Sequence, residues 1–164
     1  MADPYLTAIR KFNKAKIDYL VIGVSGINYY AKDSRQIIMT ADYDIFLKPE
    51  LRNVRESLLV MQSLEYAIVI GGRIRKSFSD KTVQGIIKKR STIVCENPEH
   101  NLIELCLEVS GYLFEKLNQN AHFFKAGKDK IRVANLKDLL RMKMFANREK
   151  DRLFLHKYAT ILSE

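Results

Sequence analysis

The sequence has few of the features that mark membrane, secreted or repetitive proteins. None of its apolar runs is long enough to cross a bilayer, because Lys, Arg or Asp interrupts every long helical pattern. The first residues lack the basic-then-apolar order of a signal peptide, and the chain contains neither repeats nor a low-complexity segment. We therefore expect a cytoplasmic protein with no membrane partner.

Cysteine and histidine are equally scarce. The 2 cysteines, Cys95 and Cys106, each fall in an apolar, strand-like segment, where we expect reduced thiols in or near the core of a cytosolic protein. The 3 histidines are scattered along the chain without the spacing of metal ligands. This distribution argues against a zinc site.

Acidic side chains are outnumbered: the 164 residues include 19 Asp and Glu against 28 Lys and Arg, which gives a net charge of +9. Such an excess attracts polyanions, including nucleic acid, nucleotides and acidic proteins. It also keeps many proteins soluble without any anionic ligand, so charge alone does not choose between these roles. With hydrophobic residues at 47%, the chain can bury the core of one compact domain.

Hydrophobic periodicity indicates a chain that alternates helices and strands and ends in helices. The predicted elements are helix 5–16, strand 17–22, helix 24–31, strand 43–47, helix 50–62, strand 66–70, strands 83–88, 92–96 and 102–109, a short helix at 112–119, strand 131–134, and helices from residue 135 onward. Residues 97–101 are expected to form a hairpin loop, and Asn135 to cap the helix that follows. This order predicts an α+β fold in which helices flank a mixed β-sheet in residues 1–134, with a C-terminal helical unit of residues 135–164 packed on that core.

Two aspartates lie next to each other on one predicted strand. Residues two apart in a strand point to the same face, so Asp42 and Asp44 project side by side, about 7 Å apart at Cα, while Tyr43 points into the core. Neighbouring carboxylates repel each other unless a cation lies between them, and Mg²⁺ binds such oxygens while leaving positions for water and phosphate. The alternative is a strand that simply starts with two solvated acids.

Two further segments supply candidate phosphate-binding and acidic groups. Gly23 ends a buried strand and opens a helix, so free backbone N–H groups and the Ser25 hydroxyl can contact phosphate oxygens there. On the strand at 102–109, Glu104 lies on the polar face; beside the aspartate strand it would complete a set of three carboxylates, as a general base or a metal ligand. An ordinary strand–helix turn and a solvated glutamate on an open sheet face are the alternatives.

Basic residues gather in three other places. These are Arg73, Arg75, Lys76 and Lys81; Lys88, Lys89 and Arg90; and Lys125, Lys128, Lys130 and Arg132. With nearby phenylalanines they could guide a nucleic-acid acceptor by charge and stacking, or they could belong to solvated loops. No RNA-binding motif decides between the two.

These segments, in this order, resemble the DNA polymerase β-like nucleotidyltransferase superfamily, and within it the small bacterial nucleotidyltransferases related to the AbiEii toxin group. The likeness is carried by residues 19–23, 40–45, 103–105 and 135–151, and it spans nearly the whole chain. In the last phrase, Lys143, Arg148 and the pair Lys150–Asp151 follow the order that such relatives carry. A continuous helix there would place Lys143 and Lys150 on one face, with the Lys143 ammonium directed into a cleft.

The resemblance implies a metal-dependent transfer of NMP from an NTP to an acceptor, with release of pyrophosphate. It implies Mg²⁺ or Mn²⁺ held by Asp42, Asp44 and Glu104, which would also be the catalytic residues. The residues expected to contact the triphosphate are Gly23, Ser25, Lys143, Arg148 and Lys150. The toxin-group relatives suggest RNA, in particular tRNA, or a protein as acceptor, and an antitoxin or another partner protein; a small-molecule acceptor is equally compatible with these residues.

Three positions depart from the pattern of those relatives. Val24 stands where a second Gly or a Ser is usual, Glu104 where Asp is usual, and Phe154 where an Asp often follows the Lys–Asp pair. The alternative function is therefore a non-catalytic member of the same fold that binds nucleic acid or a partner protein. A metal-dependent nuclease is a third interpretation of the paired acids.

Overall fold

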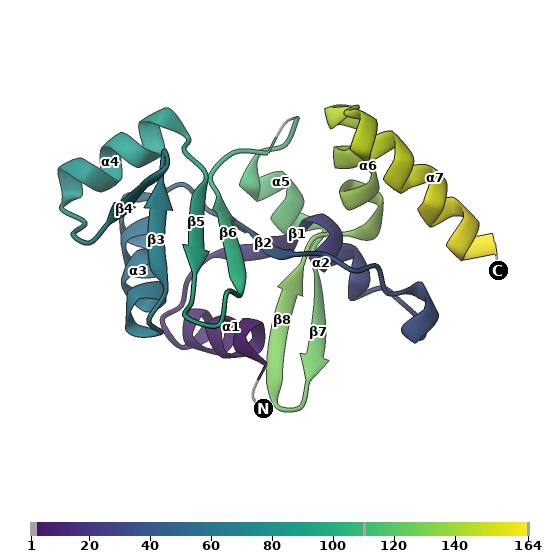
Figure 1. Ribbon diagram of the computed structural model, residues 1–164, viewed down its shortest axis with the longest axis horizontal. Helices are drawn as coiled ribbons and strands as arrows, with labels where there is room; N and C mark the ends of the chain where they lie inside the picture. The colour runs from purple at the N-terminus through teal and green to yellow at the C-terminus, as the bar shows by residue number, and fades with distance from the viewer. Residues whose placement is uncertain (1–2, 110, 164) are drawn as a thin grey trace.

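The computed structural model describes residues 3–109 and 111–163, with side chains described to residue 160 (Figure 1). Among the described residues, no helix combines the length and the apolar character needed to cross a membrane. In chain order the elements are α1 (Pro4–Lys14), β1 (Tyr19–Ile22), α2 (Gly23–Asn28), the 3₁₀ helix η1 (Ser34–Gln36), β2 (Asp42–Leu47), α3 (Leu51–Ser63), β3 (Ala67–Ile70), β4 (Arg73–Arg75), α4 (Asp80–Lys89), β5 (Ile93–Glu96), β6 (Leu102–Cys106), α5 (Phe114–Gln119), β7 (His122–Ala126), β8 (Asp129–Val133), α6 (Leu136–Ala146) and α7 (Glu149–Ser163).

The strands form one 8-stranded mixed sheet in the order β4-β3-β5-β6-β2-β1-β8-β7. β2 runs parallel to β6 and β1 runs parallel to β8, whereas the other neighbours are antiparallel. The register pairs Asp44 with Glu104 across β2 and β6, and Ile22 with Asp44 across β1 and β2. The predicted α+β fold with a mixed sheet flanked by helices is confirmed, while the division of the chain at residue 134 stays a prediction.

The two faces of β2 meet different surroundings. Tyr43 is buried on one face, where Tyr5 of α1 stacks on it with ring centroids 4.8 Å apart. Asp42 and Asp44 are half-buried on the opposite face, as the alternation of a strand requires. Farther along that face, Phe46 is buried against α5. The carboxylates therefore lie at the start of β2, on the sheet face that α5 covers farther along the strand.

Most predicted elements are present with ends shifted by a few residues, but the predicted strand at 83–88 is wrong. The segment belongs to α4, whose first turn is capped by the Ser79 hydroxyl, which accepts the N–H of Thr82 at 3.2 Å. Val83 and Ile86 are three apart and both buried, so the apolar residues follow the period of a helix. Sequence reasoning also missed β4 and β7, which form hairpins with β3 and β8.

The C-terminal phrase forms two separate helices (Figure 1). Asn135 caps α6 by accepting the N–H of Lys137 at 2.9 Å, as predicted. The helix ends at Asn147, which adopts a left-handed conformation with φ 45°. Lys143 and Lys150 therefore lie on two separate helices, so the shared face that a continuous helix would give them does not form.

Asn53 of α3 forms hydrogen bonds with the residue that precedes β1 and with the residue that follows β2. Its side-chain oxygen accepts the N–H of Asp18 at 2.8 Å, and its side-chain nitrogen donates to the carbonyls of Asp18 at 2.9 Å and Lys48 at 3.0 Å. The residue is 2% exposed. Because Asp18 precedes β1 and Lys48 follows β2, one buried amide satisfies three backbone groups at the end of the strand pair.

We expect Asn53→Ala to lower the free energy of unfolding by about 2–4 kcal/mol, because it leaves buried backbone groups without partners. Urea unfolding followed by circular dichroism measures the loss. Ser57→Ala is the matched control, since Ser57 is equally buried in α3 but its hydroxyl only donates to the carbonyl of Asn53 at 2.7 Å within the same helix. Equal losses in both variants would contradict the role given to Asn53.

Candidate active site

Three carboxylates face each other across β2 and β6. The oxygens of Asp42, Asp44 and Glu104 come within 4.8 Å of one another, and all three residues are half-buried. The parallel register places Glu104 beside Asp44, and the alternation of β2 places Asp42 on the same face. The structure therefore brings together the three residues that sequence analysis proposed as catalytic and metal-binding.

The crowding of negative charge perturbs these groups. Burial, followed by the charges of Asp42 and Glu104, raises the pKa of Asp44 to about 7, while Lys143 acts in the opposite direction. Burial and Asp42 raise the pKa of Glu104 as well, whereas Asp44 and Lys150 lower it. A divalent cation between the oxygens would remove the repulsion, and a set of carboxylate oxygens suits Mg²⁺ or Mn²⁺. The residues present therefore fit the metal expected from the sequence.

Gly23 lies against the carboxylate of Asp44. Its φ of 65° is in the left-handed region, and a Cβ built on it would lie 2.2 Å from Asp44 Oδ2. Only glycine fits this position without displacing the carboxylate. The backbone of the β1–α2 turn thus lies directly beside the acidic cluster, and its contact with a triphosphate stays a prediction.

Ser25 stabilises the same turn through hydrogen bonds to the backbone of β2. Its hydroxyl accepts the backbone N–H of Asp44 at 3.0 Å and donates to the carbonyl of Asp42 at 3.4 Å. The residue is 5% exposed and is not among the residues that line the cleft over the carboxylates. Ser25 therefore contacts the backbone of two predicted site residues and fixes α2 to β2, while its own contact with phosphate stays a prediction.

A cleft of about 720 Å³ runs over the acidic cluster. Residues from the sheet and from the two C-terminal helices line it together. The predicted site residues among them are Gly23, Asp42, Asp44, Glu104, Lys143, Arg148 and Lys150. The cleft thus brings carboxylates from the centre of the sheet and basic side chains from α6 and α7 to one space, although these segments are far apart in the sequence.

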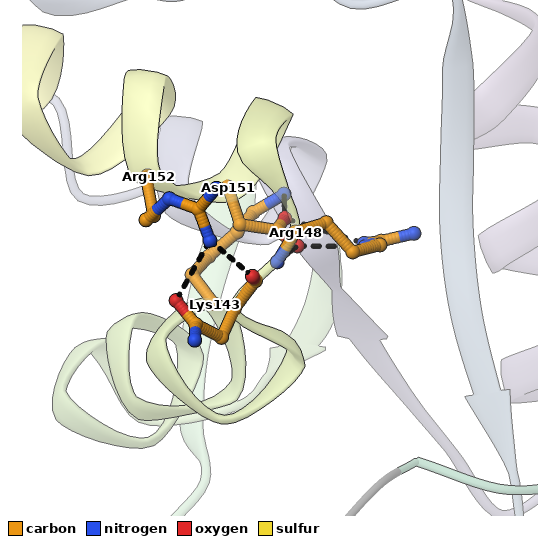
Figure 2. Close-up of polar contacts among 5 residues, drawn as sticks. Lys143, Arg148, Asp151 and Arg152 are labelled. Carbon is orange, nitrogen blue, oxygen red and sulfur yellow. Dashed lines mark hydrogen bonds and ion pairs between the residues drawn. The ribbon is translucent and has the colours of Figure 1, made fainter.

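A buried aspartate holds two of the basic side chains (Figure 2). Asp151 is 0% exposed, and its carboxylate accepts from Lys143 Nζ at 3.4 Å and from Arg148 Nε at 2.6 Å. Burial opposes ionisation, but hydrogen bonds from Arg148 and the charge of Lys143 lower the pKa of Asp151. Lys143 Nζ also lies 4.9 Å from the ring centroid of Phe154. Asp151 therefore fixes the direction of both cations at the edge of the cleft.

Sequence reasoning missed this role of Asp151 and the contacts of two other cleft residues. The signal for Asp151 was its position three residues after Arg148, a spacing that brings opposite charges together on a helix. The sequence marks Phe154 only as a departure from the pattern of relatives, yet its ring packs against Lys143. Thr40 donates to Asp42 Oδ1 at 3.1 Å, and no local pattern pointed to it.

No protein-family model matches the chain, and no curated protein sequence matches it either. Solved structures do resemble it. The lincosamide antibiotic adenylyltransferase LnuA, with lincomycin bound, aligns with a TM-score of 0.62 and 12% identity over 98% of each chain. An antigenic nucleotidyltransferase-like protein from Paracoccidioides brasiliensis aligns with a TM-score of 0.56 and 14% identity over 98% of this chain and 75% of that one. The chain has a nucleotidyltransferase fold.

We expect Gly23→Ala to weaken divalent-cation binding at least tenfold, because the new Cβ forces the Asp44 carboxylate aside. The left-handed φ adds strain of about 1–3 kcal/mol. Mn²⁺ titration by calorimetry and thermal unfolding measure the two effects. Gly85→Ala in α4 is the control: its Cβ meets nothing within 4 Å, so stability should stay the same or rise slightly. Unchanged Mn²⁺ affinity in a folded Gly23→Ala protein would show that the close approach has no bearing on the metal site.

We expect Asp44→Asn to stabilise the metal-free protein at pH 8. The pKa of Asp44 rises from 3.8 to about 7 on folding, so the folded state holds this proton more tightly than the unfolded chain. The resulting stability is complete below about pH 4 and is lost as the pH rises through about 7. Asparagine carries no charge there, so the variant should gain about 1–3 kcal/mol at pH 8 and much less at pH 4.

Urea unfolding in EDTA at the two pH values measures this difference. Addition of Mg²⁺ at pH 8 should then stabilise the natural protein and leave Asp44→Asn unaffected. If Asp44→Asn is less stable than the natural protein at pH 8 without metal, the charge of Asp44 does not destabilise the fold as we infer.

Proposed function

We propose that the chain transfers a nucleoside monophosphate from an NTP to a hydroxyl acceptor and releases pyrophosphate. The observation that carries this proposal is one cleft in which three carboxylates, within 4.8 Å of one another, share the lining with Lys143, Arg148 and Lys150. Carboxylates suit a divalent cation, and basic side chains suit phosphate oxygens, so the cleft can take both parts of a metal–triphosphate complex. The nucleotidyltransferase fold supports the same class of reaction.

In this proposal the three carboxylates have two roles, which are metal binding and acceptance of a proton. Asp42 and Asp44 would hold Mg²⁺ or Mn²⁺, which offsets the charge of the phosphates when it is bound. Glu104 would accept the proton of the acceptor hydroxyl or join the metal ligands, and its raised pKa makes it a stronger base than an ordinary glutamate. The acceptor oxygen forms a bond to the α-phosphorus while the bond from that phosphorus to the bridging oxygen breaks. The electron pair of the broken bond leaves with pyrophosphate.

The basic side chains differ in how firmly they are held for phosphate. The side chain of Lys143 is 17% exposed and is fixed by Asp151 and Phe154, so it loses little freedom on binding an anion. The side chain of Arg148 is 57% exposed, which leaves part of its guanidinium free for a ligand. Lys150 is exposed and acts on the pKa of Glu104 through its charge. We therefore expect Lys143 to orient the triphosphate and the other two to add attraction.

The finer assignment concerns the acceptor and partners. The toxin-group resemblance supports RNA, in particular tRNA, or a protein as acceptor, and an antitoxin or other partner protein. LnuA is a lincosamide antibiotic adenylyltransferase with a similar fold, which supports adenylyl transfer as the reaction class. Val24 favours a second candidate function, because it lines the cleft where relatives have Gly or Ser. That candidate is a non-catalytic module that binds nucleic acid or a partner protein.

Incubation of the protein with NTPs labelled at the α-phosphate, Mg²⁺ and a cell extract tests the proposal. We expect label to enter RNA or protein, and Asp42→Asn/Asp44→Asn to lower the rate at least about 100-fold. Asp33→Asn is the control, because Asp33 is an exposed acid paired with Arg35 outside the cleft. Mg²⁺-dependent thermal stabilisation by each NTP identifies the donor.

Two results would reject the transfer reaction. Thermal stabilisation by RNA but by no NTP would support the non-catalytic module. Degradation of labelled RNA in the absence of any NTP would support a metal-dependent nuclease.

A further inference from the structure

Positive charge is concentrated in one segment that the proposed chemistry does not use. Residues 71–92 carry seven basic side chains and one acidic one, so 22 residues hold +6 of the net charge of +9. The segment covers β4, α4 and their connections. Figure 1 shows these elements at the end of the molecule opposite α7. A charge excess this local acts on a ligand at one place, whereas dispersed charge serves solubility.

A groove of about 620 Å³ lies between β4 and α4. Arg73 and Arg75 pair with the buried residues Ile70 and Ile68 of β3, so both arginines point to one face of the hairpin. Lys81 and Lys89 of α4 line the same groove. No acidic residue is among the described residues that line it. Four cationic side chains from two elements therefore converge on one space.

These four cations are available to a ligand. Arg73, Arg75, Lys81 and Lys89 are all exposed, and among the described residues none of them has a carboxylate within 4.0 Å. The acidic residue of the segment, Asp80, pairs instead with Arg55 of α3. Like charges that share a groove repel one another, and a polyanion that bridges them removes the repulsion.

The lining indicates which polyanion fits. The groove contains no aromatic side chain among its described lining residues, so it offers no surface on which unpaired bases could stack. Phosphate contacts remain, and a base-paired RNA stem is recognised through its phosphates and 2′-hydroxyls and less through its bases. We propose that this groove binds the backbone of a base-paired RNA stem, and that this RNA is the acceptor of the cleft; the second part rests on the proposed function.

The groove and the cleft open on opposite faces of the sheet, because the register places Arg73 and Arg75 on the face of Tyr43 and the three carboxylates on the other. One short segment of chain connects them. Lys89 lines the groove, and the next residue, Arg90, donates to Glu108 at 2.9 Å. Glu108 lines the cleft over the three carboxylates. In the sheet, β4 lies four strands from β2, a distance of about 19 Å at the usual strand spacing. An RNA stem in the groove would therefore have to pass a free end around the sheet, past Arg90 and Glu108, to reach the cleft on the other face.

Binding of a fluorescently labelled RNA hairpin, followed by anisotropy in EDTA without NTP over a range of KCl concentrations, tests the groove. Four phosphate contacts predict a slope of log K against log salt of about −3 to −4. Arg73→Gln/Arg75→Gln should weaken binding at least tenfold and reduce the steepness of the slope by about 1.5. The matched control, Lys125→Gln/Lys128→Gln, removes two exposed charges from the β7–β8 hairpin at the opposite edge. It should leave both quantities nearly unchanged.

Equal losses in the two double variants would overturn the groove as a site, because the binding would then depend on overall charge. Competition by poly-glutamate as strong as by unlabelled RNA would overturn the assignment to RNA. The assay contains no NTP, so it separates this inference from the proposed function. Groove-dependent binding without any label transfer would reject the enzyme and keep the groove, and transfer to RNA that Arg73→Gln/Arg75→Gln leaves intact would reject the groove and keep the enzyme.

Discussion

The mutual repulsion of three carboxylates is the constraint around which this structure is arranged. Asp42, Asp44 and Glu104 come within 4.8 Å of one another on a half-buried surface, where water screens their charges less than it would on an exposed loop. Such a cluster is unfavourable by itself, and burial together with this repulsion raises the pKa of Asp44. It persists because the rest of the fold determines the position of each strand, and it becomes favourable when a cation enters.

Burial of apolar side chains on the opposite face of the sheet keeps the three carboxylates in place. Tyr43 and Ile103, neighbours in sequence of the acidic residues, are buried in the core, so neither strand can turn its carboxylates away without exposing apolar surface. Ser25 adds hydrogen bonds to the backbone of β2, and Gly23 leaves room for the Asp44 carboxylate. Hydrophobic burial on one face thus offsets electrostatic repulsion on the other.

The basic side chains of the cleft are kept from collapsing onto the acidic cluster. Without a partner of their own, Lys143 and Arg148 would be drawn to the carboxylates and would fill the cation site with ammonium and guanidinium groups. Asp151 gives both of them a buried partner. Because Asp151 belongs to α7 and Lys143 to α6, this contact also fixes the angle between the two helices after the break at Asn147. The cleft can therefore stay open, as the proposed metal–triphosphate complex requires.

Local features of this site could be predicted from sequence, and long-range ones could not. The period of a strand was enough to place Asp42 and Asp44 on one face, and the end of a buried strand marked Gly23 as a turn residue. The proximity of Glu104 depends on the pairing of β2 with β6, which is decided by packing across some sixty residues of chain. Residues 83–88 of α4 resemble a strand because β-branched residues cluster near Ile86 and Ile87. The Ser79 cap and the burial of apolar residues at helical spacing override that preference.

The topology also explains why the basic groove lies where it does. β2 and β6 are parallel neighbours, and parallel strands require a long crossover between them. Here the crossover comprises α3, β3, β4, α4 and β5, so it extends the sheet beyond β6 by three strands. The segment that must exist to make the acidic strands adjacent thus includes residues 71–92, which carry a net charge of +6. It returns to the sheet through Arg90, whose partner Glu108 borders the cleft. An anionic ligand held by Arg73 and Arg75 would therefore lie on the opposite face of the sheet from the carboxylates, and only a part of it that passes Arg90 and Glu108 would reach them.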